Sequence, residues 1–198
     1  MRTSSILLLL LFATRAHADE IGARAQPAHP TGDGFYLAMS FGFAFPTLTE
    51  SGMSDSERLA GSRIKASLGW RRGIVAIEPT FGFQSIDRAS YAMHTDTTIE
   101  EVAFYGAQVK LVSRGPAAWF ARLGPQRSWT NPNIGKYREG GGFEGGIGIQ
   151  LGHREGPLAA GFMLETSYSV TWLAADGAPT QRISTQLLSL GFGGGTGY

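Results

Sequence analysis

The chain has 198 residues, of which 17 are Lys or Arg and 16 are Asp or Glu, and it contains no cysteine. The nearly even charge balance, without a block of like charges, argues against nucleic acid as a partner. Without cysteine, neither disulfides nor thiolate metal ligands can hold the fold. Beyond the amino-terminal segment no run of 18 apolar residues occurs, so the sequence predicts that any membrane crossing uses a closed β-barrel.

The first 18 residues predict a secretory signal peptide, because a basic start is followed by an apolar run over residues 6–13 and by a small-x-small cleavage site ending at Ala18. Removing this segment leaves 15 basic against 16 acidic residues, a net charge of −1. A retained anchor is the alternative, although the run is too short to span a bilayer as a helix. Residues 19–33 are expected to form a short periplasmic lead.

From Phe35 to Phe45, every odd position carries a large apolar side chain and every even position is small or mildly polar. A period of two over about ten residues is the length that a tilted strand needs to cross a bilayer. Seven further segments show similar alternation, least clearly in the fourth of the eight. They cover residues 62–72, 74–84, 100–112, 118–126, 142–152, 158–172 and 183–193. The sequence therefore predicts eight strands.

The connections between these segments alternate between long and short. The long ones cover residues 46–61, 85–99, 127–141 and 173–182, and the tight turns lie near Gly73, Gly115 and Gly156. An even strand number with short turns at one end and longer loops at the other is typical of a bacterial outer-membrane barrel. We predict an all-β fold over residues 34–198: a single closed antiparallel eight-stranded up-and-down transmembrane β-barrel with short periplasmic turns and longer extracellular loops.

The two faces of these strands differ in charge. The bulky apolar face is almost free of charged residues, whereas the other face combines Gly, Ala and Ser with a few charges. A Lys or Arg at mid-depth on a lipid-exposed face would cost about 2–4 kcal/mol, which favours the apolar face outside and the charges inside. A soluble lipocalin-like barrel, with the apolar side chains around an internal ligand, is the alternative.

Seven charged residues share the inward face near mid-barrel depth. They are Lys65, Glu78, Arg122 and Glu165, with Arg63, Lys110 and Glu144 slightly above or below. Buried charges are tolerated when they are paired, so we predict an ion-pair layer that plugs the lumen, with Lys65 and Glu78 as neighbours. Glu78 and Glu165 could instead be paired catalytic carboxylates, but the nearby cations favour structural pairing.

Aromatic residues cluster towards the strand ends at two heights and predict two interfacial girdles. The inner girdle comprises Phe35, Trp70, Trp119 and Phe192, and the outer girdle comprises Phe45, Phe83, Trp129 and Trp172. A general preference of aromatic residues for strands explains their number but not this clustering. Two prolines count against a closed ladder, because Pro79 and Pro125 lack a backbone donor and would need a bulge.

Other motifs are weaker. Gly140, Gly142 and Gly145 match the dinucleotide-binding pattern, but the following residues keep a period of two and predict no helix to receive a pyrophosphate, so no cofactor is expected. The mature histidines fall in separate parts of the topology, so no metal site is expected. His94 and Asp96 form the one candidate catalytic pair, in an outer loop, where a merely solvated polar loop is favoured.

The chain resembles the small outer-membrane barrels of the OmpA/OmpX type. The strand at 35–45, the Phe-Gly-Phe triplets at 41–43 and 81–83, the segment 143–148 and the aromatic carboxyl end carry the likeness. The resemblance implies a monomeric, plugged barrel in the outer membrane, in contact with membrane lipid and lipopolysaccharide. It also implies delivery by periplasmic chaperones and the barrel-assembly machinery.

In this family such a barrel is an envelope structural element or an adhesion and binding platform that acts through its outer loops. The alternatives are an enzyme that modifies outer-leaflet lipid A through the His94 region, and a small diffusion pore. The glycine-rich tail after Phe192 departs from the family pattern. It leaves open whether Phe192 or Tyr198 is the aromatic residue that signals barrel assembly.

Overall fold

The computed structural model describes residues 33–52, 56–86, 101–115, 117–130, 137–155 and 158–198. The predicted signal peptide and all but the last residue of the predicted lead lie outside this part of the chain, as does most of the connection at 85–99. Among the described residues, no helix has the length and apolar character needed to cross a membrane.

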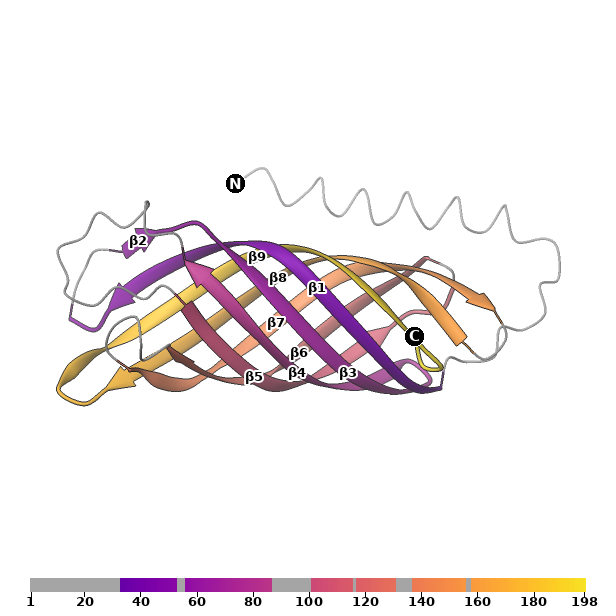
Figure 1. The fold of residues 1–198 in the computed structure, drawn as a ribbon, viewed down its shortest axis with the longest axis horizontal. Coiled ribbons are helices and arrows are strands. Elements are labelled where there is room, and N and C mark those ends of the chain that lie inside the picture. The colour runs from indigo at the N-terminus through magenta and orange to yellow at the C-terminus, as the bar shows by residue number, and fades with distance from the viewer. Residues whose placement is uncertain (1–32, 53–55, 87–100, 116, 131–136, 156–157) are drawn as a thin grey trace. The chain divides into compact units, whose positions relative to one another are not determined.

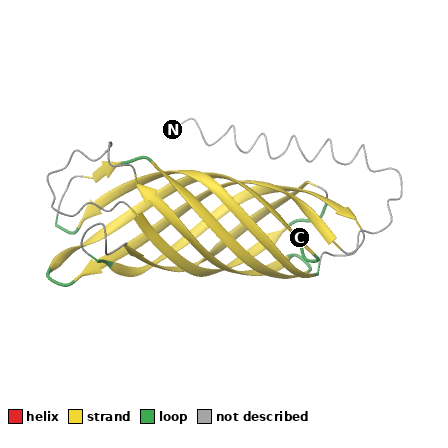
Figure 2. Ribbon diagram, in the orientation of Figure 1, coloured by secondary structure: helices red, strands yellow, loops and turns green. Residues whose placement is uncertain are grey.

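The described strands are all antiparallel to their neighbours and form one sheet (Figures 1 and 2). They are β1 (Gly34–Glu50), β2 (Ser56–Arg58), β3 (Gly61–Arg72), β4 (Val75–Ile86), β5 (Glu101–Val112), β6 (Ala117–Thr130), β7 (Glu139–Glu155), β8 (Leu158–Ala175) and β9 (Ala178–Gly195). Pairing of β1 with both β3 and β9 closes the eight long strands into a barrel. The predicted closed eight-stranded fold is confirmed, with β2 added against the end of β1.

The prediction of a long connection over residues 173–182 is wrong. β8 continues to Ala175 and pairs there with Ala178 of β9, so Asp176 and Gly177 form a tight hairpin turn. Gly177 has a φ of 66°, and an Asp-Gly pair favours such turns because glycine adopts positive φ without a steric penalty. The polar ends of β8 and β9 pair with each other, although they lack the apolar alternation by which a strand is recognised in a sequence.

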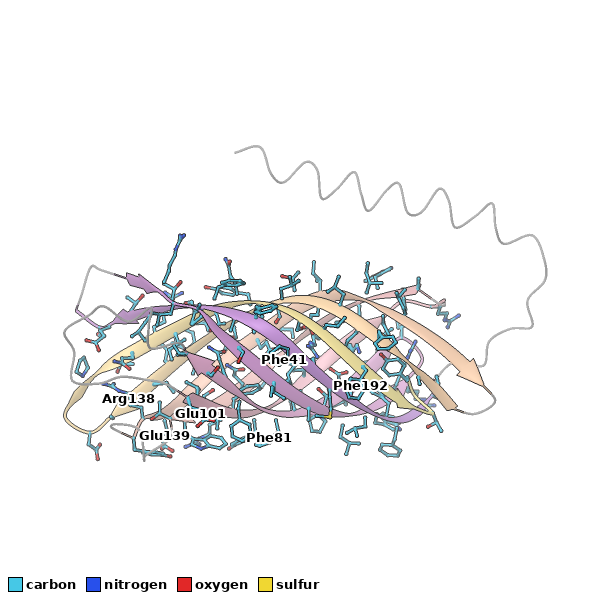
Figure 3. The ribbon with its side chains drawn as sticks, turned by 45° about the horizontal axis from the view of Figure 1, so that its top comes forward. Phe41, Phe81, Glu101, Arg138, Glu139 and Phe192 are labelled. Atoms are coloured by element: carbon cyan, nitrogen blue, oxygen red, sulfur yellow. The ribbon has the colours of Figure 1, made fainter. Side chains whose placement is uncertain are left out.

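Burial along the strands is the reverse of that in a water-soluble protein. Phe35 and Phe43 are 65% and 63% exposed, whereas Ala38 and Ala44 are 4% and 1% exposed. Figure 3 shows side chains along the outside of the barrel, and large apolar side chains of every long strand are exposed there. The predicted face assignment is correct, and the lipocalin-like alternative, which requires the bulky residues inside, is not supported.

The two prolines are accommodated without a bulge. Pairing of β3 with β4 skips the two positions between Ser67–Thr80 and Trp70–Ile77, and the register is the same on both sides of the gap. Pairing of β5 with β6 skips two positions around Pro125 in the same way. Each strand residue directs its N–H to one neighbouring strand, so a proline weakens the ladder on one side and leaves the other side paired.

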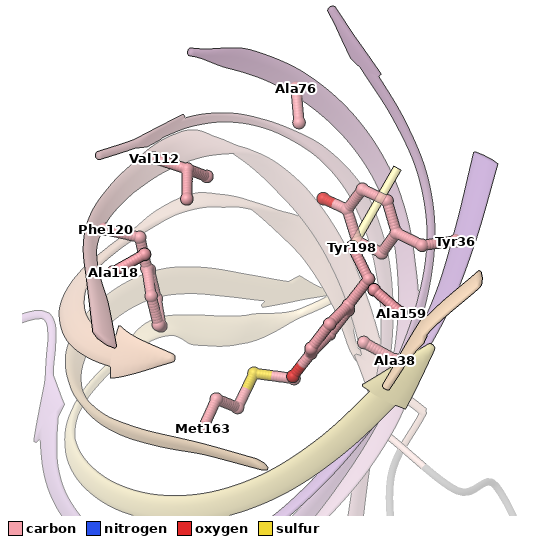
Figure 4. Packing of buried hydrophobic residues seen from close by; sticks show 9 residues of the cluster. All are labelled: Tyr36, Ala38, Ala76, Val112, Ala118, Phe120, Ala159, Met163 and Tyr198. Atoms are coloured by element: carbon pink, nitrogen blue, oxygen red, sulfur yellow. The ribbon is translucent and has the colours of Figure 1, made fainter. Parts of the chain in front are cut away.

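The lumen is filled in layers. An apolar cluster fills the end with the short turns, and it includes Tyr36, Phe120, Met163 and Tyr198 (Figure 4). A second apolar cluster fills the opposite end, with Leu48, Ile86, Val102, Leu173 and Ile183 among its members. The inward-facing charged residues lie on the strands between these two clusters.

The carboxyl-terminal tail folds back over the barrel end. The Gly197 N–H donates to the Phe35 carbonyl at 3.1 Å, and the ring of Tyr198 packs edge-on against Tyr36 with ring centroids 6.1 Å apart. A Cβ at Gly193 would lie 2.4 Å from the Tyr198 ring, so the glycine of the last strand leaves room for this ring. Tyr198 therefore belongs to the interior, whereas Phe192 is 59% exposed on the outer face.

Candidate functional site

The seven charged residues of the predicted layer all point into the lumen and are each at most 5% exposed. They come from six neighbouring strands: Arg63 and Lys65 from β3, Glu78 from β4, Lys110 from β5, Arg122 from β6, Glu144 from β7 and Glu165 from β8. The closed ring therefore brings together residues that are up to 102 positions apart in the sequence, since it places these strands around one axis. We call these seven residues the charged layer.

Glu144 forms the centre of one half of the charged layer. Its carboxylate accepts from Lys65 Nζ at 2.5 Å and from Nη2 of Arg63. The Arg63 guanidinium also lies over the Phe104 ring, 3.8 Å from its centroid, and donates to Ser169 Oγ at 3.4 Å. This packing fixes the arginine in the lumen and satisfies most of its donors.

Arg122 forms the centre of the other half. Its Nε donates to Glu165 Oε1 at 2.6 Å, and its Nη1 donates to Glu78 Oε2 at 3.4 Å. Lys110 Nζ lies 3.3 Å from the second oxygen of Glu78, which also accepts from the Tyr36 hydroxyl. Both carboxylates that could have formed a catalytic pair are thus bound to the same arginine, as structural pairing requires.

The prediction that Lys65 and Glu78 are neighbours is wrong. In the register of β3 with β4, Lys65 lies opposite Gly82, four positions along β4 from Glu78. Counting residues from the turns gives Lys65 and Glu78 a similar depth, but the tilt and stagger of strands in a small barrel move such residues apart. Lys65 instead reaches across the lumen to Glu144, and Glu78 contacts Lys110 and Arg122.

Sequence reasoning missed the role of Tyr36. The alternation along the strand places it only on the small and mildly polar face, but its hydroxyl donates to Glu78, and its ring fills the space beside Gly69. A Cβ at Gly69 would lie 2.1 Å from the Tyr36 ring, so the glycine makes room for it. Tyr36 occupies an inward-facing position in the alternation of its strand. Because a buried tyrosine hydroxyl needs a polar partner, this position could have indicated a hydrogen bond inside the lumen.

Tyr198 closes the same end of the lumen from the tail that follows β9. Its side chain is only 7% exposed. Burial, with a smaller contribution from the negative charge of Glu78, raises the pKa of the Tyr198 hydroxyl to about 12. The hydroxyl is therefore neutral at physiological pH and adds no negative charge beside Glu78.

The eight aromatic residues of the predicted girdles face outward. Seven of them are between 43% and 65% exposed: Phe35, Phe45, Trp70, Phe83, Trp119, Trp172 and Phe192. Trp129 is half-buried against Tyr105, with ring centroids 5.8 Å apart. Phe35 pairs directly with Trp70 across β1 and β3, which places these two at one height.

The candidate loop residues His94 and Asp96 lie outside the described residues, so their arrangement stays a prediction. Within the described part of the chain, no group of three or more His, Asp or Glu side chains is placed to hold a metal ion. The residues Gly140–Gly145 lie within β7 and pair with β8, so the glycine motif belongs to a strand.

The partner assignment can be tested by double-mutant cycles. Replacing Glu144 with Gln leaves Arg63 and Lys65 without their carboxylate, and breaking a buried pair costs about 3–5 kcal/mol of unfolding free energy. We expect the K65M/E144Q double variant to be less destabilised than the sum of the single variants by about 1 kcal/mol or more. Equilibrium unfolding by denaturant in detergent measures these values. A larger coupling of Lys65 with Glu78, from K65M and E78Q, would contradict the assignment.

Some solved structures are similar to this chain at low sequence identity. No protein-family model and no curated protein sequence matches the chain. Neisserial surface protein A is similar to it with 15% identity and a TM-score of 0.48, over 81% of this chain and 96% of that one. Ail, the attachment invasion locus protein of Yersinia pestis, is similar with 15% identity and a TM-score of 0.44, over 81% of this chain and 99% of that one. The fold assignment rests on the strand pairing of the chain itself.

Proposed function

We propose that this chain is an integral barrel of the bacterial outer membrane, plugged by its charged layer, which serves as an envelope structural element or as an adhesion and binding platform. The observation that carries the proposal is the inverted burial. Phe41, Leu123 and Leu190 are 51%, 64% and 62% exposed, whereas Lys110 and Glu165 are each 1% exposed. Only an apolar surrounding makes this arrangement favourable.

The size of the apolar surface supports a lipid environment. Water-soluble monomers rarely expose contiguous apolar patches larger than a few hundred Å². Here large apolar side chains are exposed on all eight long strands, from Phe35 on β1 to Phe192 on β9. The outward aromatic residues near the strand ends are suited to the polar boundaries of a bilayer, where we place the two girdles. Membrane lipid and lipopolysaccharide are then the partners of the outer wall.

The contents of the lumen support a plugged barrel. The charged layer crosses the lumen from β3 to β8, and apolar clusters lie on either side of it. Phe120 belongs to the cluster at the short-turn end, and its ring centroid lies 4.5 Å from Lys110 Nζ. An ion in transit would have to separate the ion pairs of the layer, which is costly at low dielectric.

The unequal strand lengths support a role for the loop end. β1 has 17 residues and β8 and β9 have 18, whereas β3, β4 and β5 have 12, and at the loop end β1 stays paired with β9 as far as Glu50 and Gln181. Since a strand of about 9–11 residues spans the bilayer, one side of the barrel extends well beyond it. Tyr137, 47% exposed, and the exposed pair Arg127–Glu139 lie near this end and present aromatic and charged groups to a partner.

The location of the two terminal aromatic residues favours one of them as the assembly signal. Phe192 is exposed on the last strand in phase with Leu188 and Leu190, where the assembly machinery can reach it during biogenesis. Tyr198 is buried in the lumen. We therefore assign the signal to Phe192 and an interior packing role to Tyr198. The lipid-modifying alternative depends on His94 and Asp96, which lie outside the described residues.

A heat-modifiability gel on cell fractions tests the membrane assignment. We expect the protein in the outer-membrane fraction, with different migration before and after boiling, because a closed ladder resists SDS until it is heated. The same protein in the soluble periplasm, with migration unchanged by boiling, would contradict the proposal.

Conductance in planar bilayers tests the plug. The unaltered barrel is expected to be silent, and R122A, which removes the centre of one half of the charged layer, is expected to produce discrete conductance steps. R127A removes an arginine on the outer face and serves as the matched control, with no steps expected. A gel shift on heating verifies that each variant is folded. A folded R122A barrel that stays silent would show that the charged layer is not the plug, and steps from the unaltered protein would favour a pore.

A further inference from the structure

The charged layer carries more positive than negative charge. It contains four cations, Arg63, Lys65, Lys110 and Arg122, and three carboxylates, Glu78, Glu144 and Glu165, which gives a formal surplus of +1. All seven side chains are at most 5% exposed, so water cannot screen this charge effectively. An uncompensated buried charge costs several kcal/mol.

One cation of the layer has an unused donor. Arg63 directs Nη2 to Glu144 and to Gln126 Oε1, and Nη1 to Ser169 Oγ. Within the described residues its Nε has no hydrogen-bond partner, and neither has Oγ of Ser128, which is 1% exposed. A buried donor without a partner costs about 1–3 kcal/mol, so both groups favour an acceptor from solution.

Arg63 and Ser128 line the same small cavity on the side of the charged layer towards the second apolar cluster. The centre of a water-sized sphere can occupy about 10 Å³ within it, so the cavity holds a single small occupant. Gln84, Gln126, Ser169 and Thr185 are among its other polar lining residues, and none of the described lining residues is a carboxylate. The polar side chains that the structure describes around it are therefore one guanidinium and neutral amides and hydroxyls.

We propose that this cavity binds a small monovalent anion of the size of chloride. Such an anion accepts from Arg63 Nε and Ser128 Oγ, and it supplies the negative charge that the layer lacks. A neutral water would satisfy the two donors and leave the surplus charge in place. Polyatomic anions, such as phosphate or a carboxylate, are too large for this space. The proposal concerns the interior and is independent of what the outer loops bind.

Thermal unfolding of the purified protein in detergent tests the site. Sodium chloride is compared with sodium gluconate at equal ionic strength, because gluconate is too large to enter. We expect chloride to raise Tm by about 3 °C. In Q126E, a carboxylate beside Arg63 replaces the anion and should remove the difference between the two salts. S128A, which removes one donor, should raise the half-saturating chloride concentration about tenfold.

S67A is the matched control, because Ser67 is a buried lumen serine on β3 that does not line the cavity. It should keep the chloride response of the unaltered protein. Equal Tm values in both salts for the unaltered protein would overturn the proposal, as would an S67A response as weak as that of S128A. Equal values are the result expected if a lysine of the layer is neutral.

Crystals of the unaltered protein grown in sodium bromide locate the site directly and do not depend on the folding of Q126E. We expect an anomalous peak within hydrogen-bond distance of Arg63 Nε and Ser128 Oγ. Bromide peaks confined to other places, or none in the lumen, would overturn the assignment.

Discussion

The structure depends on one constraint, the period-two alternation of side chains in a ring of strands that has no free edge. Because successive residues point to opposite faces, a shift of one residue in any strand would carry its whole apolar set into the lumen and its charges to the outside. In β6, such a shift would expose Arg122 on the outer wall and bury Leu123. The strand register that places the apolar side chains on the outer wall is therefore also the register that brings the ion pairs together in the lumen. Neither feature can form without the other.

The same constraint determines which side chains fill the lumen. A narrow interior needs small side chains, and glycines such as Gly69 provide the space that the Tyr36 ring occupies. The strands between the two apolar clusters carry charges whose partners come from strands far apart in the sequence, as with Arg63 of β3 and Glu144 of β7. The ion pairs thus stabilise the barrel across its interior, while the backbone hydrogen bonds between strands stabilise it around the wall. A barrel held in both ways is a rigid support for its loops and extended strand ends.

The amino-acid sequence was sufficient to predict the closed eight-stranded fold, the identity of the two faces and the membership of the charged layer. All three depend on residue parity and local pattern. It was not sufficient to predict the pairing within the layer: Lys65 meets Glu144 instead of Glu78, because stagger between tilted strands is set by closure of the whole ring. It also placed a long loop where β8 and β9 form a hairpin, although Asp176-Gly177 carries the turn signal. The inward fold of the tail, with Tyr198 against Tyr36, depends on tertiary packing for which no local pattern exists.

The most direct test of the account is a spin-label scan along β1 of the barrel in lipid vesicles. The chain has no native cysteine, so single cysteines at residues 35–45 can be labelled without background. Collision rates with oxygen, which concentrates in the bilayer, are measured by electron paramagnetic resonance. The account predicts maxima at the odd positions, where Phe35, Phe41 and Phe45 face outward, and minima at the even positions. Maxima at the even positions, or no period of two, would contradict it.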